Sequence, residues 1–198
     1  GFLARMDLRL RPGGERSPLV QSLDEMEIYY ISSKEIWERQ ALIKATKIIG
    51  NSECEENFFK MITPFVYRSL LDQTVLIDVE KVKNLIEEEH LRESILNVKL
   101  GVGGIREIEF FVQTFQLLYG GVEPKLRNPS TLEALNLLDQ LNLVPERDLK
   151  TLEEAYSFLR NVENHLQLRE ENQTHILKTL TTMIIIIIIV VQDLIAII

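Results

Sequence analysis

The sequence predicts an α+β fold that is mostly helical. One segment near the start, residues 3–11, alternates apolar and polar side chains as a half-buried strand does. Most of the following chain carries apolar residues at helical spacing, separated by capping signals and prolines. With 198 residues, 45% of them hydrophobic, the chain is long enough and apolar enough to build a core.

The polar face of the alternating segment carries one carboxylate and two guanidinium groups, from Asp7, Arg9 and Arg11. Successive side chains on one face of a strand lie about 7 Å apart. One carboxylate there can hold Mg²⁺ while arginines contact phosphate oxygens. The alternative is a polar sheet face on which Asp7 pairs with its neighbouring arginines.

Two capping boxes follow the alternating segment. Ser22 and Glu25 predict a helix through Tyr30, and Ser32 with Glu35 predicts a second helix that runs through Ile49.

In the second of these helices, Glu38 falls inside an apolar arc that includes Trp37, and Lys44 lies on its margin. A carboxylate in such a place needs a partner, and Arg9 or Arg11 would suit. Glu38 is therefore a candidate anchor for phosphate-facing arginines, with a purely structural ion pair as the alternative.

Residues 97–104 form a glycine-rich loop that leads into a helix ending at Gly120. Gly101, Gly103 and Gly104 permit positive φ and a close approach of backbone amides to a ligand. The first N–H groups of the helix then favour a phosphate or a carboxylate. The alternative is a tight turn whose glycines only allow a sharp helix entry.

The helix after this loop carries a polar stripe of Arg106, Glu109, Gln113 and Gln116 between two apolar faces. Because apolar residues flank the stripe on both sides, we expect it to line a cleft or a seam rather than to face water. The alternative is an Arg106–Glu109 pair beside a buried helix.

The other predicted elements are helices joined by short loops, as in a bundle. Pro64 separates a helix over residues 55–62 from another over 65–71, and a charged helix spans residues 78–96. Ser130 caps a helix through Leu141, and Pro145 precedes a long helix to about Arg169. Polar residues in the long helix are expected on the surface or in a bundle seam: Arg160, Glu163 and His165.

Composition narrows the class of protein. The 22 basic and 30 acidic residues give a net charge of -8, which argues against a sequence-independent nucleic-acid binder. The single cysteine, Cys54, permits no intrachain disulfide and has no zinc-site neighbours, so we expect a reducing cytoplasm. Gly1 opens no signal peptide, and we expect a truncated N-terminus.

Residues 181–198 differ from the rest of the chain, with six consecutive isoleucines among nine uninterrupted apolar residues. This run is shorter than the roughly 20 residues that span a bilayer as a helix. We interpret the segment as a sequence artefact and expect no membrane association. A membrane tether is the alternative hypothesis.

Three motifs occur in register: DLRLRPGG at residues 7–14, WERQALIKA at residues 37–45 and KLGVGGIREIEF at residues 99–110. Together they resemble the family of the bifunctional glutamine synthetase adenylyltransferase/adenylyl-removing enzyme, from about residue 3 to residue 180. The resemblance implies that residues 1–50 are the C-terminal part of a truncated nucleotidyltransferase domain and that residues 51–180 form a helical domain. The last motif resembles the N-terminal, adenylyl-removing half.

The resemblance implies phosphorolysis of the adenylyl group from a tyrosine of glutamine synthetase, which releases ADP in nitrogen regulation. The implied partners are glutamine synthetase, the PII signalling protein, ADP or ATP, and phosphate, with Mg²⁺ as cofactor. The alternative from a different class is a catalytically inert helical module that binds glutamine synthetase or PII.

Carried over by position, Asp7 would be the third metal-binding carboxylate of the site, acting with an Asp-x-Asp pair. Arg9, Arg11 and Lys44 would supply positive charge to phosphate oxygens. The helical side of the same cleft would consist of Lys99, Gly103, Gly104, Arg106, Glu107 and Glu109. Because only six residues precede Asp7, the pair has no place in the sequence and we expect the isolated chain to be inactive.

Overall fold

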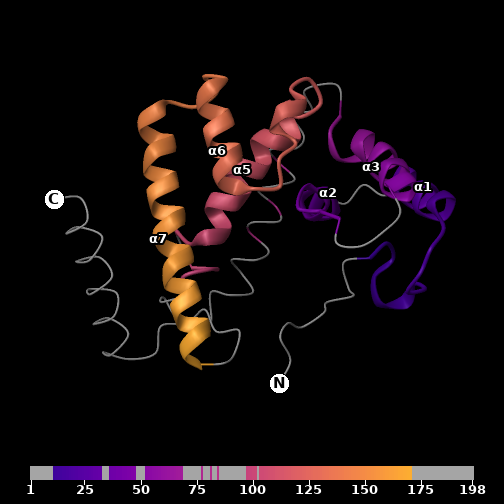
Figure 1. Cartoon of the computed structure of the whole chain (residues 1–198), viewed down its shortest axis with the longest axis horizontal. Helices are drawn as coiled ribbons and strands as arrows, with labels where there is room; N and C mark the ends of the chain where they lie inside the picture. The colour runs from indigo at the N-terminus through magenta and orange to yellow at the C-terminus, as the bar shows by residue number, and fades with distance from the viewer. Residues whose placement is uncertain are drawn as a thin grey trace. The chain divides into compact units, whose positions relative to one another are not determined.

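The computed structural model describes residues 11–32, 36–47, 52–68, 77, 81, 84, 97–101 and 103–170. Within these ranges every secondary-structure element is an α-helix or a 3₁₀ turn, so the mostly helical part of the prediction is confirmed (Figure 1). The predicted strand at residues 3–11 lies outside the described residues except for Arg11, and the β part of the fold class stays a prediction.

Helices α1 (Leu23–Ser32), α2 (Ile36–Ile43) and α3 (Ser52–Val66) follow a short 3₁₀ turn, η1 (Gly14–Arg16). The later elements, in chain order, are α5 (Ile105–Tyr119), η2 (Pro124–Leu126), α6 (Thr131–Gln140) and α7 (Glu146–Glu170).

The chain divides into two compact units, each of which is described separately. The first unit consists of residues 1–82 and 112–141, and the second of residues 83–111 and 142–198. The boundary therefore falls within α5, between Phe111 and Val112. The predicted domain boundary at residue 50 stays a prediction.

Helix α1 begins as its capping box predicts. The backbone N–H of Ser22 donates to Glu25 Oε2 over 2.9 Å, and the N–H of Glu25 donates to Ser22 Oγ over 3.3 Å. The bond from the Ser22 N–H, and then a 3.0 Å bond from the Ser22 hydroxyl to the same carboxylate oxygen, hold the pKa of Glu25 below its usual value of 4.5.

The second capping box does not start α2 at Ser32, because Ser32 is the last residue of α1 and its hydroxyl donates to the Tyr29 carbonyl. Helix α2 also ends at Ile43, six residues before the predicted end at Ile49. At this end Lys44 N–H bonds the Ala41 carbonyl three residues back, a tighter turn that closes the helix.

The predicted break at Pro64 is wrong, since α3 continues through this residue to Val66. Proline lacks the N–H that would bond the Lys60 carbonyl, but both Pro64 and Lys60 are exposed, so water can bond that carbonyl. The next turn is retained because Tyr67 N–H donates to the Thr63 carbonyl over 2.8 Å. The predicted helix at 78–96 lies outside the described residues except for the helical positions 81 and 84.

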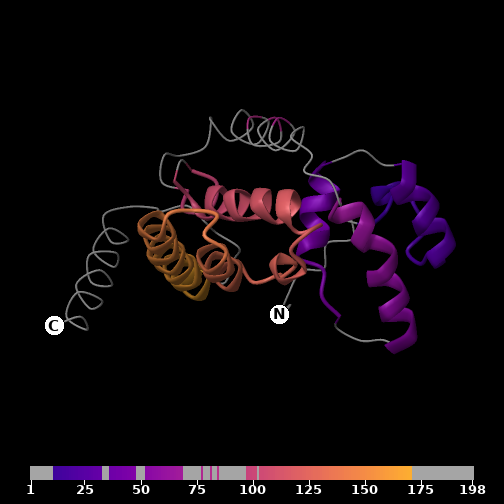
Figure 2. The ribbon, with the colours of Figure 1, turned by 90° about the horizontal axis from the view of Figure 1, so that it is seen from above.

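The core of the first unit joins α2, α3 and the second half of α5. Ile36 and Ile43 of α2 pack with Val66 of α3 and Leu117 of α5. Helix α1 lies along α3, with the rings of Tyr30 and Phe65 4.8 Å apart (Figure 2). Ser130 caps α6 as predicted, accepting the N–H of Glu133.

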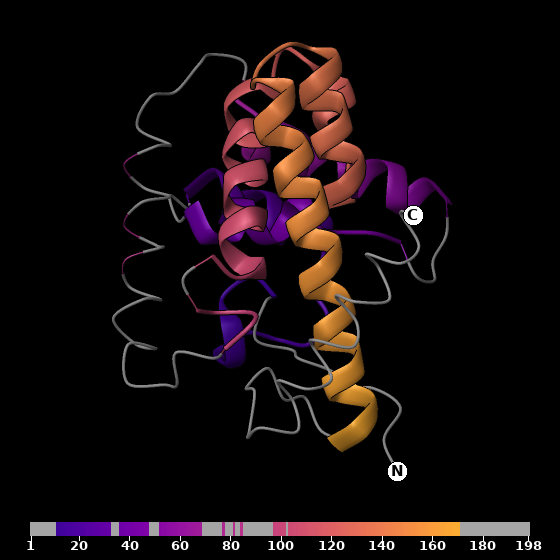
Figure 3. The same cartoon turned by 90° about the vertical axis from the view of Figure 1, so that its left-hand side faces the viewer.

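The second unit is built on α7, which follows Pro145 as predicted (Figure 3). The buried apolar residues of α7 are Leu149, Tyr156, Val162 and Leu166. Among the described helices, none combines the length and apolar character needed to cross a bilayer.

Candidate functional site

The glycine loop of the second unit is closed by its own first residue. Asn97 Oδ1 accepts the N–H groups of Lys99 and Leu100 over 3.0 and 2.9 Å, and the Asn97 carbonyl accepts the N–H of Gly101 over 2.8 Å. Because the side chain and the carbonyl of Asn97 accept the N–H groups of three consecutive residues, the loop has little freedom before α5.

All three predicted glycines are required by the loop geometry, since a Cβ at Gly101 would lie 2.5 Å from the Asn97 carbonyl oxygen. Gly103 has φ of +73°, in the left-handed region that favours glycine. A Cβ at the buried Gly104 would lie 2.7 Å from the Gly101 carbonyl oxygen and 2.9 Å from that of Lys99. Any side chain at residue 104 would therefore displace the loop backbone.

The first N–H groups of α5 donate within the chain. Ile105 and Arg106 donate to the carbonyls of Val98 and Lys99 over 3.0 Å, and Gly103 donates to Glu107 Oε2 over 2.9 Å. This geometry matches the tight-turn interpretation of the loop. An anion at this loop would consequently be bound by side chains rather than by these amides.

The loop is attached to α7 by two neighbouring pairs of residues. Val98 packs against Val162 and Leu166, while Lys99 Nζ lies 3.5 Å from Glu163 Oε1. Glu163 is only 2% exposed, and its second oxygen accepts Arg160 Nη1 over 2.5 Å. Of the three polar α7 residues expected on the surface or in a seam, His165 is exposed and Glu163 is buried.

The first turns of α5 are attached to the same helix. Tyr156 Oη donates to Glu109 Oε1 over 3.1 Å, and the Tyr156 ring packs against Ile105 and Ile108. The guanidinium group of Arg106 lies 5.1 Å from the Phe110 ring, while its Nε is buried without a hydrogen bond. The alternative Arg106–Glu109 ion pair is not formed within the described part of the chain.

In the first unit, polar residues predicted for the site lie at both ends of α2. Glu38 is 5% exposed and accepts the hydroxyl of Tyr29 over 2.5 Å. Burial, together with the charge of Glu38, raises the pKa of the adjacent Tyr30 to about 12. Lys44 Nζ donates to the Pro129 carbonyl over 2.7 Å and to Thr131 Oγ1 over 2.8 Å.

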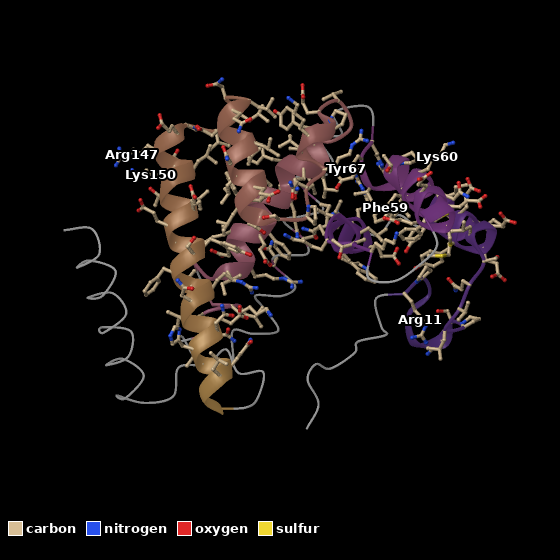
Figure 4. The ribbon with its side chains drawn as sticks, in the orientation of Figure 1. Arg11, Phe59, Lys60, Tyr67, Arg147 and Lys150 are labelled. Carbon is tan, nitrogen blue, oxygen red and sulfur yellow. The ribbon has the colours of Figure 1, made fainter. Side chains whose placement is uncertain are left out.

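Arg11 lies on the turn before η1, where its Nε and Nη2 donate to the Ser17 carbonyl over 3.2 and 3.0 Å (Figure 4). Asp7 and Arg9, the other charged residues of the predicted strand, lie outside the described residues. Their predicted roles are untested.

The expectation that the polar stripe of α5 avoids water is confirmed for its later members. Gln113 and Gln116 are 6% and 1% exposed. Gln116 Nε2 donates to the carbonyls of Leu126 and Asn128, each over 2.7 Å, which attaches the η2 loop to α5. The carbonyl oxygens of both glutamine side chains are buried without a hydrogen bond.

Comparison with known proteins identifies the family. Residues 1–61 match the family model described as glutamate-ammonia ligase adenylyltransferase, and residues 80–184 match the one described as GlnD PII-uridylyltransferase. The bifunctional glutamine synthetase adenylyltransferase/adenylyl-removing enzyme of Vibrio parahaemolyticus is 43% identical over 183 residues. The chain belongs to this adenylyltransferase/adenylyl-removing family.

The alignment covers 89% of this chain and 19% of the length of the Vibrio relative. The matched names are those of nucleotidyltransferases. The first match includes the motif around Asp7 and the motif around Glu38, whereas the glycine loop and α7 lie in the second.

The predicted magnesium site stays a prediction. The described residues contain no group of three His, Cys, Asp or Glu side chains placed to hold a metal ion. Asp7, the predicted ligand, lies outside those residues. The described carboxylates near the glycine loop, Glu107, Glu109 and Glu163, instead accept bonds from the protein itself.

Sequence reasoning missed two buried charged residues. Arg39 is 3% exposed and donates from Nε and Nη2 to the Val66 carbonyl at the end of α3, and Glu163 holds Lys99. Arg39 lies beside Glu38 in a motif of the resemblance, which was the available signal. Glu163 had no local signal, because its partner Lys99 is 64 residues away.

Proposed function

We propose that the chain is part of an enzyme that removes AMP from a tyrosine of glutamine synthetase by phosphorolysis and releases ADP. The observation that carries the proposal is the 43% identity to a bifunctional adenylyltransferase/adenylyl-removing enzyme. In this reaction a phosphate oxygen attacks the adenylyl phosphorus, the bond to the tyrosine oxygen breaks, and the tyrosine takes a proton. We place the reaction in the cytoplasm, in nitrogen regulation.

In this proposal Arg9, Arg11 and Lys44 supply positive charge to phosphate oxygens, and Glu38 positions the two arginines. Asp7 binds Mg²⁺, which would neutralise charge on the oxygens during displacement. A second group of residues contributes to binding nucleotide or phosphate through side chains: Lys99, Arg106, Glu107 and Glu109. Gly103 and Gly104 would shape the loop that carries these side chains.

The geometry of the second unit supports the second group. The side chains of Lys99 and Arg106 flank the entry to α5, where the backbone amides are already used. The Lys99 side chain is 31% exposed, and its nearest carboxylate oxygen is 3.5 Å away. An ammonium group has three donors, so this contact leaves donors for a phosphate.

The test uses the protein encoded by the whole gene, with Asp7→Ala compared against Asp24→Ala, an exposed carboxylate in the first turn of α1. We expect Asp7→Ala to abolish phosphate-dependent release of ADP from adenylylated glutamine synthetase and to leave ATP-dependent adenylylation intact. Asp24→Ala should change neither reaction. Loss of adenylylation alone would assign the chain to the transferring half, and loss of neither would refute a catalytic role for Asp7.

A second candidate function is a helical binding module without catalysis. It is favoured by the separate match of residues 80–184 to a family named for PII uridylylation. The 198-residue chain would then bind purified PII or glutamine synthetase, while Asp7→Ala in the whole protein would leave both reactions unchanged. Loss of ADP release in that variant excludes the candidate.

A further inference from the structure

Three side chains of the second unit form a charged group, of which the proposed reaction so far uses only Lys99. Glu163 Oε1 lies 3.5 Å from Lys99 Nζ, and Glu163 Oε2 lies 2.5 Å from Arg160 Nη1. Two cations therefore share one carboxylate, which leaves the three side chains with one excess positive charge.

The carboxylate of this group is inaccessible, whereas its cations are not. Glu163 is 2% exposed, but the side chains of Lys99 and Arg160 are 31% and 44% exposed. The excess positive charge therefore faces a region that an anion can enter. Other carboxylates of this region are occupied, because Glu107 accepts Gly103 N–H and Glu109 accepts the Tyr156 hydroxyl.

The two ion pairs of Glu163 differ in length and in the elements they join, and each therefore has a different role. The Arg160 contact is short and couples residues one turn apart on α7, so it fixes the carboxylate. The Lys99 contact is longer than a hydrogen bond and joins α7 to the glycine loop. Val98, the neighbour of Lys99 in the loop, packs on Val162 beside this ion pair. Two consecutive loop residues therefore contact α7.

We propose that Glu163 is a positioning residue that holds the ammonium group of Lys99, together with Arg160, in place for a phosphate dianion. The inference rests on the proposed function, in which Lys99 contributes to phosphate binding. It adds Arg160 as a second cation of that site and makes α7 responsible for its geometry.

The test measures phosphate-dependent ADP release by the whole protein with Glu163→Gln. Positioning predicts a rise in the KM for inorganic phosphate of about tenfold, within the range of coupled side chains, with an unchanged KM for adenylylated glutamine synthetase. Charge alone predicts the opposite, since removing the carboxylate makes the site more positive and would lower the KM for phosphate. A purely structural role lowers the apparent kcat through loss of folded enzyme and leaves the KM unchanged.

Two further variants sharpen the result. Glu154→Gln, an exposed carboxylate on the same helix, should leave the KM for phosphate unchanged. In a Lys99→Met background, Glu163→Gln should cause no further rise in that KM, because the residue to be positioned is absent. An unchanged or lowered KM in the single variant, or a full additional rise in the double variant, overturns the inference.

The Asp7→Ala variant separates this inference from the proposed function. If Asp7→Ala abolishes ADP release while Glu163→Gln leaves the KM for phosphate unchanged, only the positioning role fails. If Asp7→Ala has no effect on ADP release, the proposed function fails first.

Discussion

The ammonium nitrogen of Lys44 lies 2.8 Å from the hydroxyl oxygen of Thr131, which is 87 positions later in the chain. The same ammonium group donates to the Pro129 carbonyl over 2.7 Å. Thr131 is 4% exposed and is the first residue of α6. Lys44 thus joins the end of α2 to the start of α6 within the first unit.

We predict that Lys44→Met lowers the free energy of unfolding by about 1.5–3 kcal/mol, the usual contribution of hydrogen bonds to a charged group. Denaturant titration of the chain measures this change. Lys60→Met, which replaces an exposed lysine of α3 (Figure 4), is the matched control and should cost less than about 0.5 kcal/mol. Equal losses in the two variants would show that the Lys44 contacts contribute nothing.

The glycine loop gives a prediction about backbone conformation. Gly103 has φ of +73° with no atom within 4 Å of an added Cβ, so strain alone opposes a side chain. Gly103→Ala should cost about 1–2 kcal/mol, whereas Gly103→Asn should cost less because asparagine tolerates the left-handed region. Thermal unfolding of both variants provides the comparison. A cost for asparagine as large as for alanine would be inconsistent with strain.

At the next residue the obstacle is steric. A Cβ at Gly104 would meet two carbonyl oxygens at 2.7 and 2.9 Å. We therefore expect Gly104→Ala to destabilise the chain more than Gly103→Ala does, and to weaken phosphate binding by moving Lys99. The same unfolding measurement ranks the two variants, and the reverse order would contradict this loop geometry.

The buried Tyr30 and the half-buried Tyr67 predict a loss of stability at alkaline pH. Burial raises the pKa of Tyr30 and that of Tyr67 from 10.0 to about 12, although the nearby Arg127 opposes the shift at Tyr67. A folded pKa above the unfolded one gives stability that is complete below pH 10 and is lost as pH rises through about 12.

The check is the free energy of unfolding as a function of pH, in the original chain and in a Tyr30→Phe/Tyr67→Phe variant. The original chain should lose stability more steeply across this alkaline range, because phenylalanine does not titrate. Parallel curves would show that neither tyrosine is protected in the folded chain. Tyrosinate absorbance follows the same ionisation directly.

The cap of α1 gives a prediction at acid pH. Glu25 has a lowered pKa because it accepts the backbone N–H and the hydroxyl of Ser22. In Ser22→Ala the hydroxyl bond is lost, so the pKa of Glu25 should rise toward its usual value while the backbone bond keeps part of the shift. Carboxyl NMR titration measures both values. Because the folded pKa is lowered, the cap stabilises α1 above pH 4.5 and loses this effect as pH falls through the folded pKa.

Sequence reasoning predicted the starts of α1 and α6 correctly, but not the start of α2 or the ends of α2 and of the predicted helix before Pro64. The Ser22–Glu25 and Ser130–Glu133 caps involve residues three apart, so the bonds are local and can be read from the sequence. The end of α2 at Ile43 and the continuation of α3 through Pro64 were missed. Both depend on the surroundings of one carbonyl group, which local patterns do not contain.

Burial at the candidate site was also predicted only in part. The sequence predicted that Glu38 and Trp37 both lie on the apolar face of α2. Glu38 is buried, at 5% exposed, but Trp37 is 39% exposed. The predicted apolar arc was therefore correct about the carboxylate of Glu38 and wrong about the ring of Trp37, which does not pack in the core. The side that faces the core depends on where α3 and α5 lie.

The sequence by itself determined the family, the helical character of the described chain, the caps of α1 and α6, and the glycine loop before α5. These properties follow from motifs and from interactions within a few residues, which any folded context retains. Only the tertiary structure decided that Lys44 bonds Thr131 and that Glu163 is a buried partner of Lys99. These partners are 87 and 64 residues apart, so their pairing depends on how the helices pack rather than on any local pattern.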